Sequence, residues 1–192
     1  MVQLTRDQTF KVVCNIRTPI SPGEENVGTG VFIHKDNKAY LVTATHVSNA
    51  TNDNSYIILC DQSNNPMKRM LTGLNASLKW VDHKTEDISV LEIGVESNSD
   101  ILCHRCFPYD QIEFNVNKIS RDDELTSVGF PHGLGAIGKF SPFAFRSHAS
   151  SSEITLNRAD TNTPAVFICL ENPSVGGYSG GPIFDLGMVN IG

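Results

Sequence analysis

Short apolar segments separated by turn residues run through almost the whole chain, and they constrain the fold more than any other feature. Residues 30–44, GVFIHKDNKAYLVTA, show this most clearly, because two Val- and Leu/Ile-containing stretches flank the polar turn KDNK. Such stretches are typical of β-hairpins. We expect SPGEEN to form a loop, and we expect one short helical turn near THVSNA. The pattern predicts an all-β fold, with further strands within residues 9–17, 55–60, 68–74, 88–94, 124–130, 136–148, 151–158, 165–170, 181–185 and 188–192.

The strand-rich segments fall into two groups. Residues 96–117 contain no periodic element, and their polar and Pro-containing sequence suits a surface connector. This division predicts an N-terminal β unit at 1–95 and a C-terminal β unit at 118–192, with no sequence repeat between them. We expect the core of the second unit to include four aromatic side chains, Phe130, Phe140, Phe143 and Phe145.

The charge balance narrows the classes of function. The net charge is −6 and the pI is about 5.4. Proteins that bind nucleic acid usually carry a basic stripe, so this charge argues against that class, and it gives no attraction to an anionic membrane. No apolar run approaches the roughly 20 residues that span a bilayer, and the N-terminus lacks the apolar region of a secretory signal. Five irregularly spaced cysteines are a poor disulfide framework. We therefore predict a cytoplasmic protein.

A serine enclosed by glycines is the strongest local motif. Ser179 lies in GGYSGGPIFD, where the glycines permit unusual dihedral angles and a close approach to the main chain. The N–H groups of Gly177 and Ser179 can then converge on one point and stabilise an oxyanion, which is worth roughly 3–4 kcal/mol per donor in comparable sites. Taken alone, the motif also fits a glycine-rich turn before a strand.

Two other residues change the interpretation of this serine. His46 follows the strand-like AYLVTA segment, and Asp87 stands at the beginning of the apolar segment ISVLEI. Singly, His46 also fits a packed or surface side chain, and Asp87 also fits a cap at the start of a strand. Together the three residues occur in the order His, Asp, Ser, which is the order of the chymotrypsin-type triad and differs from those of subtilisins and α/β-hydrolases. The neighbouring His83 lies in a polar loop, and we expect it to be exposed.

These motifs resemble the trypsin-like serine peptidases, and the bacterial HtrA-like branch more than the digestive trypsins. The matching segments are GTGVFI, YLVTATHV, EDISVLEI, SVGFPHGLG and GGYSGGPIFDLGMVNIG. The resemblance implies two packed six-stranded antiparallel β-barrels with the active site in the cleft between them. It implies that Ser179 is the nucleophile, His46 the general base and then acid, and Asp87 the residue that holds the histidine tautomer. It also assigns the oxyanion hole to the amides of Gly177 and Ser179.

Some positions depart from the family pattern. Tyr178 stands where zymogen-type trypsins have an acid, so we do not expect activation by N-terminal cleavage. Pro173 occupies the position at the base of the specificity pocket, which favours a small or apolar side chain at the cleaved position, and Glu171 is near enough to contribute in another register. The last strand is expected to be cut short at Gly192. His132, in GFPHG, is expected in a turn near the cleft.

The predicted function is peptide-bond hydrolysis in protein substrates through an acyl-enzyme. Cys103 and Cys106 fit either half of a zinc site or a redox pair, but zinc needs about four ligands and no second pair follows, so we expect two incidental thiols in the connector, no metal and no cofactor. We expect narrow specificity, a regulatory partner or additional domains to control the activity. Two alternatives remain open: a catalytically silent binding module with the protease fold, and a viral chymotrypsin-like protease that processes its own polyprotein.

Overall fold

One antiparallel sheet forms the N-terminal half of the computed structural model, which describes residues 6–94, 98–99, 105–115 and 119–186. Its strands follow the order β5-β4-β1-β2-β3-β7-β6, and β8 pairs in parallel with β2. The alternation of apolar residues predicted most of these strands. Their bounds are β1 (Val13–Ser21), β2 (Glu24–Lys35), β3 (Lys38–Thr43), β4 (Tyr56–Cys60), β5 (Pro66–Met70), β6 (Trp80–Asp82), β7 (Ser89–Ile93) and β8 (Phe107–Pro108).

Tight turns join the first three strands. Asp36 and Asn37 have positive φ angles of 48° and 60°, as the two central residues of a type I′ hairpin turn require. This confirms the predicted KDNK turn between β2 and β3. The SPGEEN loop is shorter than expected, because Gly23, with a φ of 83°, turns the chain at once and Glu24 already pairs with Ser21.

The helices are short. The helical turn expected near THVSNA is α2 (Thr45–Asn49), whereas α1 (Arg6–Thr9) and α3 (Leu71–Leu74) lie in segments expected to be strand or unassigned. A helix of one turn shows no 3.6-residue periodicity, so the sequence pattern does not reveal it. None of the helices in the described ranges is long and apolar enough to cross a membrane.

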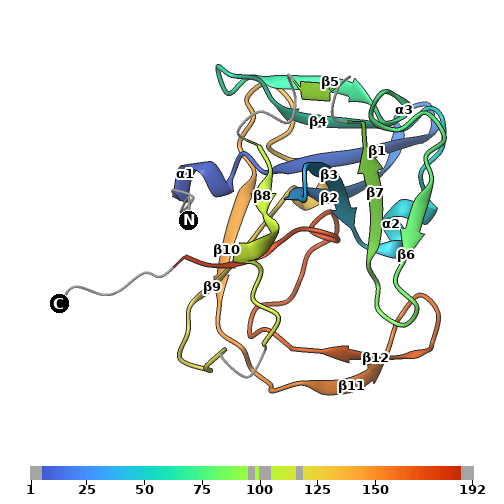
Figure 1. Ribbon diagram of the computed structural model, residues 1–192. Helices are drawn as coiled ribbons and strands as arrows, with labels where there is room; N and C mark the ends of the chain where they lie inside the picture. Colours follow the sequence, from blue (N-terminus) through green and yellow to red (C-terminus); the bar gives the residue numbers. More distant parts are fainter. Residues whose placement is uncertain (1–5, 95–97, 100–104, 116–118, 187–192) are drawn as a thin grey trace.

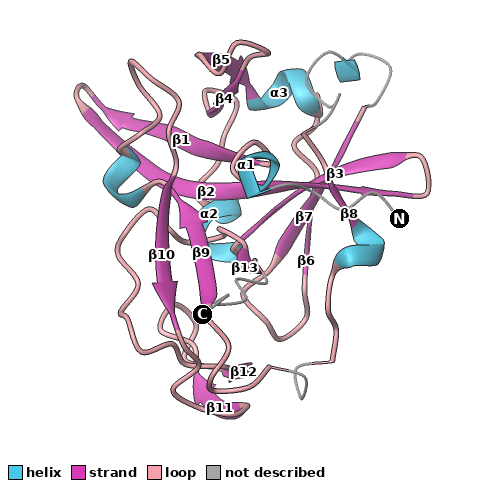
Figure 2. Ribbon diagram, turned by 90° about the vertical axis from the view of Figure 1, so that its left-hand side faces the viewer, coloured by secondary structure: helices cyan, strands magenta, loops and turns pink. Residues whose placement is uncertain are grey.

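The C-terminal half contains two smaller sheets. The central strand β9 (Leu125–Gly129) pairs with β10 (Phe143–Ser147) on one side and β13 (Ile183–Asp185) on the other. A separate hairpin is formed by β11 (Ile154–Asn157) and β12 (Pro164–Phe167), and Figures 1 and 2 show it at the end of the molecule away from β4 and β5. Two short 3₁₀ helices, η2 (Tyr109–Gln111) and η4 (Pro131–Gly133), lie in the loops. The predicted all-β class is confirmed, and the predicted interruption of the last strand lies outside the described residues.

Two apolar clusters form the interior. The first fills the N-terminal sheet and includes Phe32, Leu41 and Leu91. The second joins the two halves, because Val13 and Ile58 from the first sheet pack in one cluster with Phe130 from the second half.

Two of the four aromatic residues expected in the core are not there. Phe130 and Phe140 are buried, but Phe143 and Phe145 are each 44% exposed. Both exposed rings lie on β10, an edge strand. They alternate with Ala144 and so project from the sheet face opposite to that of the buried Val128, which pairs with Ala144. The prediction was wrong for these two residues because the sequence does not show how completely this face is covered: the Tyr178 ring packs against Phe145, but both phenylalanine rings stay partly exposed.

Candidate active site

The pairing of β3 with β7 brings His46 and Asp87 together. Thr43, the last residue of β3, pairs with Ser89, the first residue of β7. His46 follows β3 in α2, and Asp87 precedes β7, so the two side chains emerge at the same end of the strand pair. His46 Nδ1 lies 2.6 Å from Asp87 Oδ2, and the His46 main-chain N–H donates to Asp87 Oδ1 over 3.1 Å. The carboxylate thus fixes both the position and the orientation of the imidazole.

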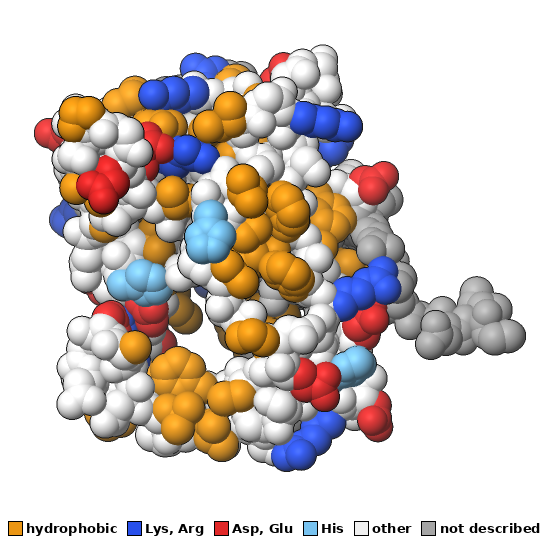
Figure 3. Space-filling view, turned by 180° about the vertical axis from the view of Figure 1, so that it is seen from behind, with side chains coloured by type: hydrophobic (Ala, Val, Ile, Leu, Met, Phe, Trp, Pro, Cys, Tyr) orange, Lys and Arg blue, Asp and Glu red, His pale blue; other side chains and the backbone are white. Residues whose placement is uncertain are grey.

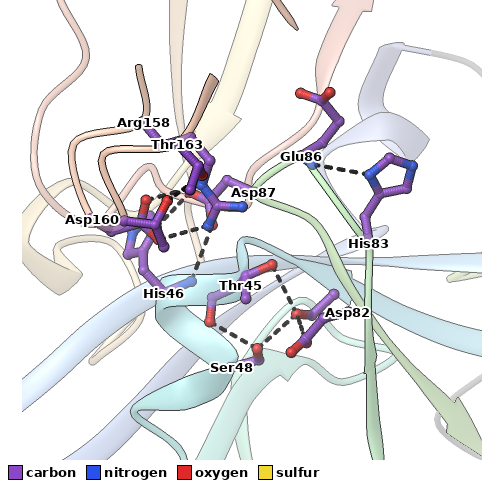
Figure 4. Close-up of polar contacts among 12 residues, drawn as sticks. Thr45, His46, Ser48, Asp82, His83, Glu86, Asp87, Arg158, Asp160 and Thr163 are labelled. Atoms are coloured by element: carbon purple, nitrogen blue, oxygen red, sulfur yellow. Dashed lines mark hydrogen bonds and ion pairs between the residues drawn. The ribbon is translucent and has the colours of Figure 1, made fainter. Parts of the chain in front are cut away.

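Hydroxyl groups beneath this pair attach α2 to the sheet. Ser48 Oγ donates to Ser89 Oγ over 2.8 Å, and Ser89 Oγ donates to Asp82 Oδ1 over 2.5 Å. These contacts are drawn in Figure 4, below the His46–Asp87 pair. Ser48 and Ser89 are buried, so their hydroxyls are shielded from water, whereas Asp82 lies at the exposed end of the network. The His46 side chain above it remains 43% exposed and accessible to a ligand.

Ser179 stands on the turn that its glycines predicted. Gly177 and Gly180 have positive φ angles of 96° and 83°, a region that favours glycine. A Cβ on Gly177 would lie 2.3 Å from the Phe130 carbonyl oxygen, and one on Gly180 would lie 2.2 Å from Thr43 Oγ1 and 2.7 Å from the Ala44 nitrogen. The turn therefore lies directly against the Thr43–Ala44 segment, which leads into the helix that carries His46.

Thr29, in the GTG segment of β2, holds the serine turn by both main chain and side chain. Its N–H donates to the Ser179 carbonyl over 2.9 Å, and its hydroxyl donates to the Gly177 carbonyl over 2.6 Å. The same hydroxyl accepts a hydrogen bond from the Phe130 N–H. Sequence reasoning assigned no role to Thr29. Its partners lie about a hundred or more residues away, so only the GTG motif itself could have drawn attention to it.

The peptide between Gly176 and Gly177 has a defined orientation. The Gly176 carbonyl accepts a hydrogen bond of 2.7 Å from the His132 N–H in η4. In a trans peptide the C=O and N–H bonds point in opposite directions, so the Gly177 N–H points away from η4. Within the described part of the chain, neither the Gly177 N–H nor the Ser179 N–H has an acceptor. Both predicted oxyanion donors are thus available, and His132 does occupy the expected turn.

The His46 imidazole and the Ser179 hydroxyl are not hydrogen-bonded to each other in this structure. Among the described residues, no contact within hydrogen-bond distance joins Ser179 Oγ to His46. Catalytic hydrogen bonds are often long in unliganded sites and tighten when substrate binds. A cavity of about 170 Å³ opens beside His46, between Val47 and Ala50 of the α2 region and Val27 and Gly28 of β2. Figure 3 shows the molecule from behind, where apolar side chains gather around a hollow in the surface.

The residues predicted for the specificity pocket lie on the surface. Glu171 and Pro173 are both exposed in the segment that leads to Ser179. Glu171 Oε2 lies 3.3 Å from His148 Nδ1, beside the end of β10. The pocket role of both residues stays a prediction. His83 is exposed, as expected, and its Nδ1 accepts a hydrogen bond from the Glu86 N–H.

Arg158 is a residue of the site that the sequence did not indicate. It follows β11, and its Nη2 donates to Asp87 Oδ1 over 3.1 Å and to Asp160 Oδ2 over 2.6 Å. The hydrogen bond from the Arg158 guanidinium lowers the pKa of Asp160, and the Asp160 carboxylate in turn raises the pKa of Arg158. His46, Asp87 and Asp160 each offer a potential metal-ligand atom within 4.8 Å of the others. The guanidinium already bonds both carboxylates, so a cation would have to displace it.

Tyr178 is buried behind the serine. Its side chain is 7% exposed, and its ring lies 5.1 Å from that of Phe145. Within the described residues the phenolic oxygen has no hydrogen-bond partner, and burial raises the pKa of Tyr178 to about 12. An acid at this position could pair with a chain terminus, but a tyrosine in this apolar setting serves as packing.

Four of the five cysteines lie among the described residues, and all four are free thiols. Cys106 is partly buried, and burial raises its pKa to about 12, which disfavours the thiolate that zinc requires. Cys103, the other member of the predicted pair, lies outside the described residues. Cys14, Cys60 and Cys169 are free thiols.

Two β-rich halves, a glycine-enclosed serine and a nearby histidine–carboxylate pair define a protein with the chymotrypsin-like fold. Residues 28–192 match the family model of the trypsin-like peptidase domain. The chain therefore belongs to the trypsin-like peptidase family.

Solved structures agree on the fold. Deg5 is 19% identical with a TM-score of 0.60, and the match covers 94% of this chain and 77% of Deg5. The HtrA-type protease AlgW, solved with a decapeptide, is 18% identical with a TM-score of 0.58, over 94% of this chain and 54% of AlgW. The MamO protease domain from Magnetospirillum magneticum is 10% identical with a TM-score of 0.58, over 94% of this chain and 81% of that domain. No curated protein matches the chain.

Proposed function

We propose that the protein is a serine endopeptidase in which Ser179, His46 and Asp87 form the catalytic triad. The observation that carries the proposal is the 2.6 Å contact between His46 Nδ1 and Asp87 Oδ2. A carboxylate on Nδ1 keeps the proton there, so Nε2 is the nitrogen free to accept a proton from a hydroxyl. Ser179, on the turn packed against Thr43 and Ala44, supplies that hydroxyl.

The proposed reaction uses only groups of this chain and water. His46 Nε2 takes the Ser179 proton while Oγ forms a bond to the scissile carbonyl carbon. The carbonyl oxygen becomes an oxyanion that accepts hydrogen bonds from the N–H groups of Gly177 and Ser179. His46 then gives its proton to the leaving amine as the peptide bond breaks, and water hydrolyses the acyl-enzyme by the same steps. Asp87 stabilises the imidazolium in both halves of the reaction.

The substrate class proposed is protein or peptide, in line with the peptidase family of the chain. A small or apolar residue at the cleaved position, with Pro173 at the base of the pocket, remains a prediction from the sequence, as do a cytoplasmic location and a regulatory partner. The half-exposed imidazole and the neighbouring cavity support access by an extended chain.

Labelling with a fluorophosphonate probe near neutral pH tests the proposal. We expect the wild-type chain to be labelled and both Ser179→Ala and His46→Ala to lose labelling. Two matched controls, Ser174→Ala and His34→Ala, remove an exposed serine close to Ser179 in sequence and an exposed histidine on β2, and should label normally. Labelling that survives in Ser179→Ala would overturn the assignment. A folded wild-type chain that is never labelled would instead favour the silent binding module.

A further inference from the structure

Arg158 reaches from the C-terminal half into the histidine–carboxylate pair of the N-terminal half. We infer that it is a positioning residue, which fixes the Asp87 carboxylate and sets the charge around His46; this inference rests on the proposed function. The Arg158 side chain is only 7% exposed, although it follows a fully exposed strand, β11. Figure 4 shows it between Asp87 and Asp160, on the side of the pair away from the hydroxyl network of Ser48.

The two oxygens of Asp87 have different partners. Oδ2 faces His46 Nδ1, whereas Oδ1 accepts from the His46 main-chain N–H and from Arg158 Nη2. These contacts together fix the rotation of the carboxylate plane. Without Arg158, the only donor left to Oδ1 among the described residues is the main-chain N–H of His46, the same residue that Asp87 must orient. The carboxylate could then swing with the imidazole, and Nε2 would lose its fixed direction towards Ser179.

The guanidinium itself is held in place. Its Nε and Nη2 donate to the two oxygens of Asp160 over 2.9 and 2.6 Å, which is the bidentate geometry suited to arginine. Its Nη1 donates to the Thr85 carbonyl over 3.2 Å. The β11–β12 hairpin adds a second contact to the same loop, because the Val166 N–H donates to Glu86 Oε2 over 3.2 Å. The hairpin therefore contacts all three residues of the 85–87 segment, including the proposed catalytic aspartate.

Charge gives Arg158 an effect that a purely structural contact would lack. The charged groups around His46 are Asp87 and Glu86 from the loop before β7, and Arg158 and Asp160 from the hairpin. A carboxylate oxygen of Asp160 lies within 4.8 Å of both a ring nitrogen of His46 and a carboxylate oxygen of Asp87. While Arg158 is present, its positive charge compensates the second carboxylate. Without it, two carboxylates would face one imidazole and would stabilise the protonated, inactive form of His46.

Three variants of the full chain test this: Arg158→Gln, Arg158→Lys and Asp160→Asn. The first readout is the fluorophosphonate labelling rate between pH 5 and 9. We expect Arg158→Gln to slow labelling about 10- to 100-fold at pH 7, which is the scale of losses caused by misplaced catalytic groups. The acidic limb of its pH profile of labelling should move to higher pH. Arg158→Lys keeps the positive charge but not the bidentate guanidinium. The acidic limb of the pH profile should therefore stay near its wild-type position, while the labelling rate remains reduced. Asp160→Asn removes a negative charge near His46, so the acidic limb of the pH profile should move to lower pH.

The second readout does not depend on acylation. In a Ser179→Ala background, NMR follows the pH at which the His46 imidazole takes up its proton, and we expect that pH to rise with Arg158→Gln. If wild-type labelling fails but this shift is seen, the peptidase proposal fails and the role of Arg158 stands. If the Arg158→Gln variant folds with an unchanged His46 titration and an unchanged pH profile of labelling, Arg158 only anchors the hairpin and the inference is overturned. Should that variant not fold, an unchanged His46 titration in Asp160→Asn together with a wild-type labelling rate in Arg158→Lys would overturn it equally.

Discussion

His46 and Ser179 come from opposite sides of the same site, and they are held by different kinds of interaction. The histidine side depends on charged side chains, with Asp87 bonded to both the imidazole and Arg158. The serine side depends on the main chain, with Gly177 and Gly180 in conformations and spaces that admit no Cβ. The first kind of support responds to pH and to the loss of a charge, whereas the second responds to added volume. Substitutions on the two sides should therefore have different effects on the labelling rate and on the free energy of unfolding.

Asp87→Asn should have the largest effect and should leave the fold intact. An amide in place of the carboxylate favours the wrong histidine tautomer, which in a comparable triad lowers kcat about 10⁴-fold. Because Asp87 is partly exposed and the buried Arg158 keeps its two hydrogen bonds to Asp160, we expect the free energy of unfolding to change by less than about 1 kcal/mol. Fluorophosphonate labelling kinetics and urea unfolding measure the two quantities. A labelling rate within tenfold of wild type would show that the histidine side does not depend on this charge.

Gly177→Ala should have the next largest effect and should act on both rate and stability. The new Cβ would meet the Phe130 carbonyl at 2.3 Å and the His132 nitrogen at 2.7 Å, and the φ of 96° disfavours alanine. We expect the Gly176–Gly177 peptide to turn, so that one oxyanion donor is lost and labelling falls about 10²- to 10³-fold. The backbone strain should lower the free energy of unfolding by about 1–3 kcal/mol.

Gly73→Ala is the matched control for that substitution. Gly73 lies in α3, its φ is not positive, and a Cβ there meets nothing within 4 Å. Alanine should therefore be neutral or stabilise by about 0.4–1 kcal/mol. If Gly177→Ala behaved like this control in urea unfolding and in labelling, the serine turn would have room for a Cβ at this position, and our account of the serine side would be wrong.

Tyr178→Phe is expected to have a smaller effect than either Asp87→Asn or Gly177→Ala. Because the buried hydroxyl has no partner among the described residues, its removal should raise the free energy of unfolding by about 1 kcal/mol. In the folded protein the pKa of Tyr178 is raised to about 12 by burial, against about 10 in the unfolded chain. The unfolded state therefore loses its proton first, so wild-type stability should fall as pH rises from 10 towards 12.

Urea unfolding at pH 8, 10 and 11 compares the wild type with this variant. The pKa of Tyr56 is also raised, first by burial and then by its hydrogen bond to Glu25, and it contributes equally in both proteins. The difference between the two should therefore widen above pH 10. Labelling should be unaffected, since only the main chain of residue 178 serves the turn. A variant that is less stable at pH 8 would mean that the hydroxyl has a partner.

The sequence predicted those parts of the site that depend on local pattern. His46 was predicted from the strand before it, and the turn at Ser179 from its glycines, because strand alternation and glycine dihedrals are properties of neighbouring residues. The type I′ turn at Asp36 and Asn37 was predictable for the same reason.

Contacts between distant segments were not predictable in this way. Arg158 is 71 residues from Asp87, and Thr29 is 148 residues from Gly177, so no local motif joins them. The exposure of Phe143 and Phe145 was missed for a related reason. An apolar side chain on a strand indicates one face of a sheet, but only the packing of other elements decides whether that face is covered.

The apolar cluster shared by the two halves limits how they can move. Val128 in β9 and Phe130, the residue that follows this strand, pack with Val13 and Ile58 from the first sheet. All four side chains are buried. Fully burying a side chain of this size contributes about 1.5–3 kcal/mol, so a hinge motion that separated the two halves would expose several such groups to water at once. The two halves should accordingly unfold as one cooperative unit. His46 and Ser179 should then separate only when the whole protein unfolds.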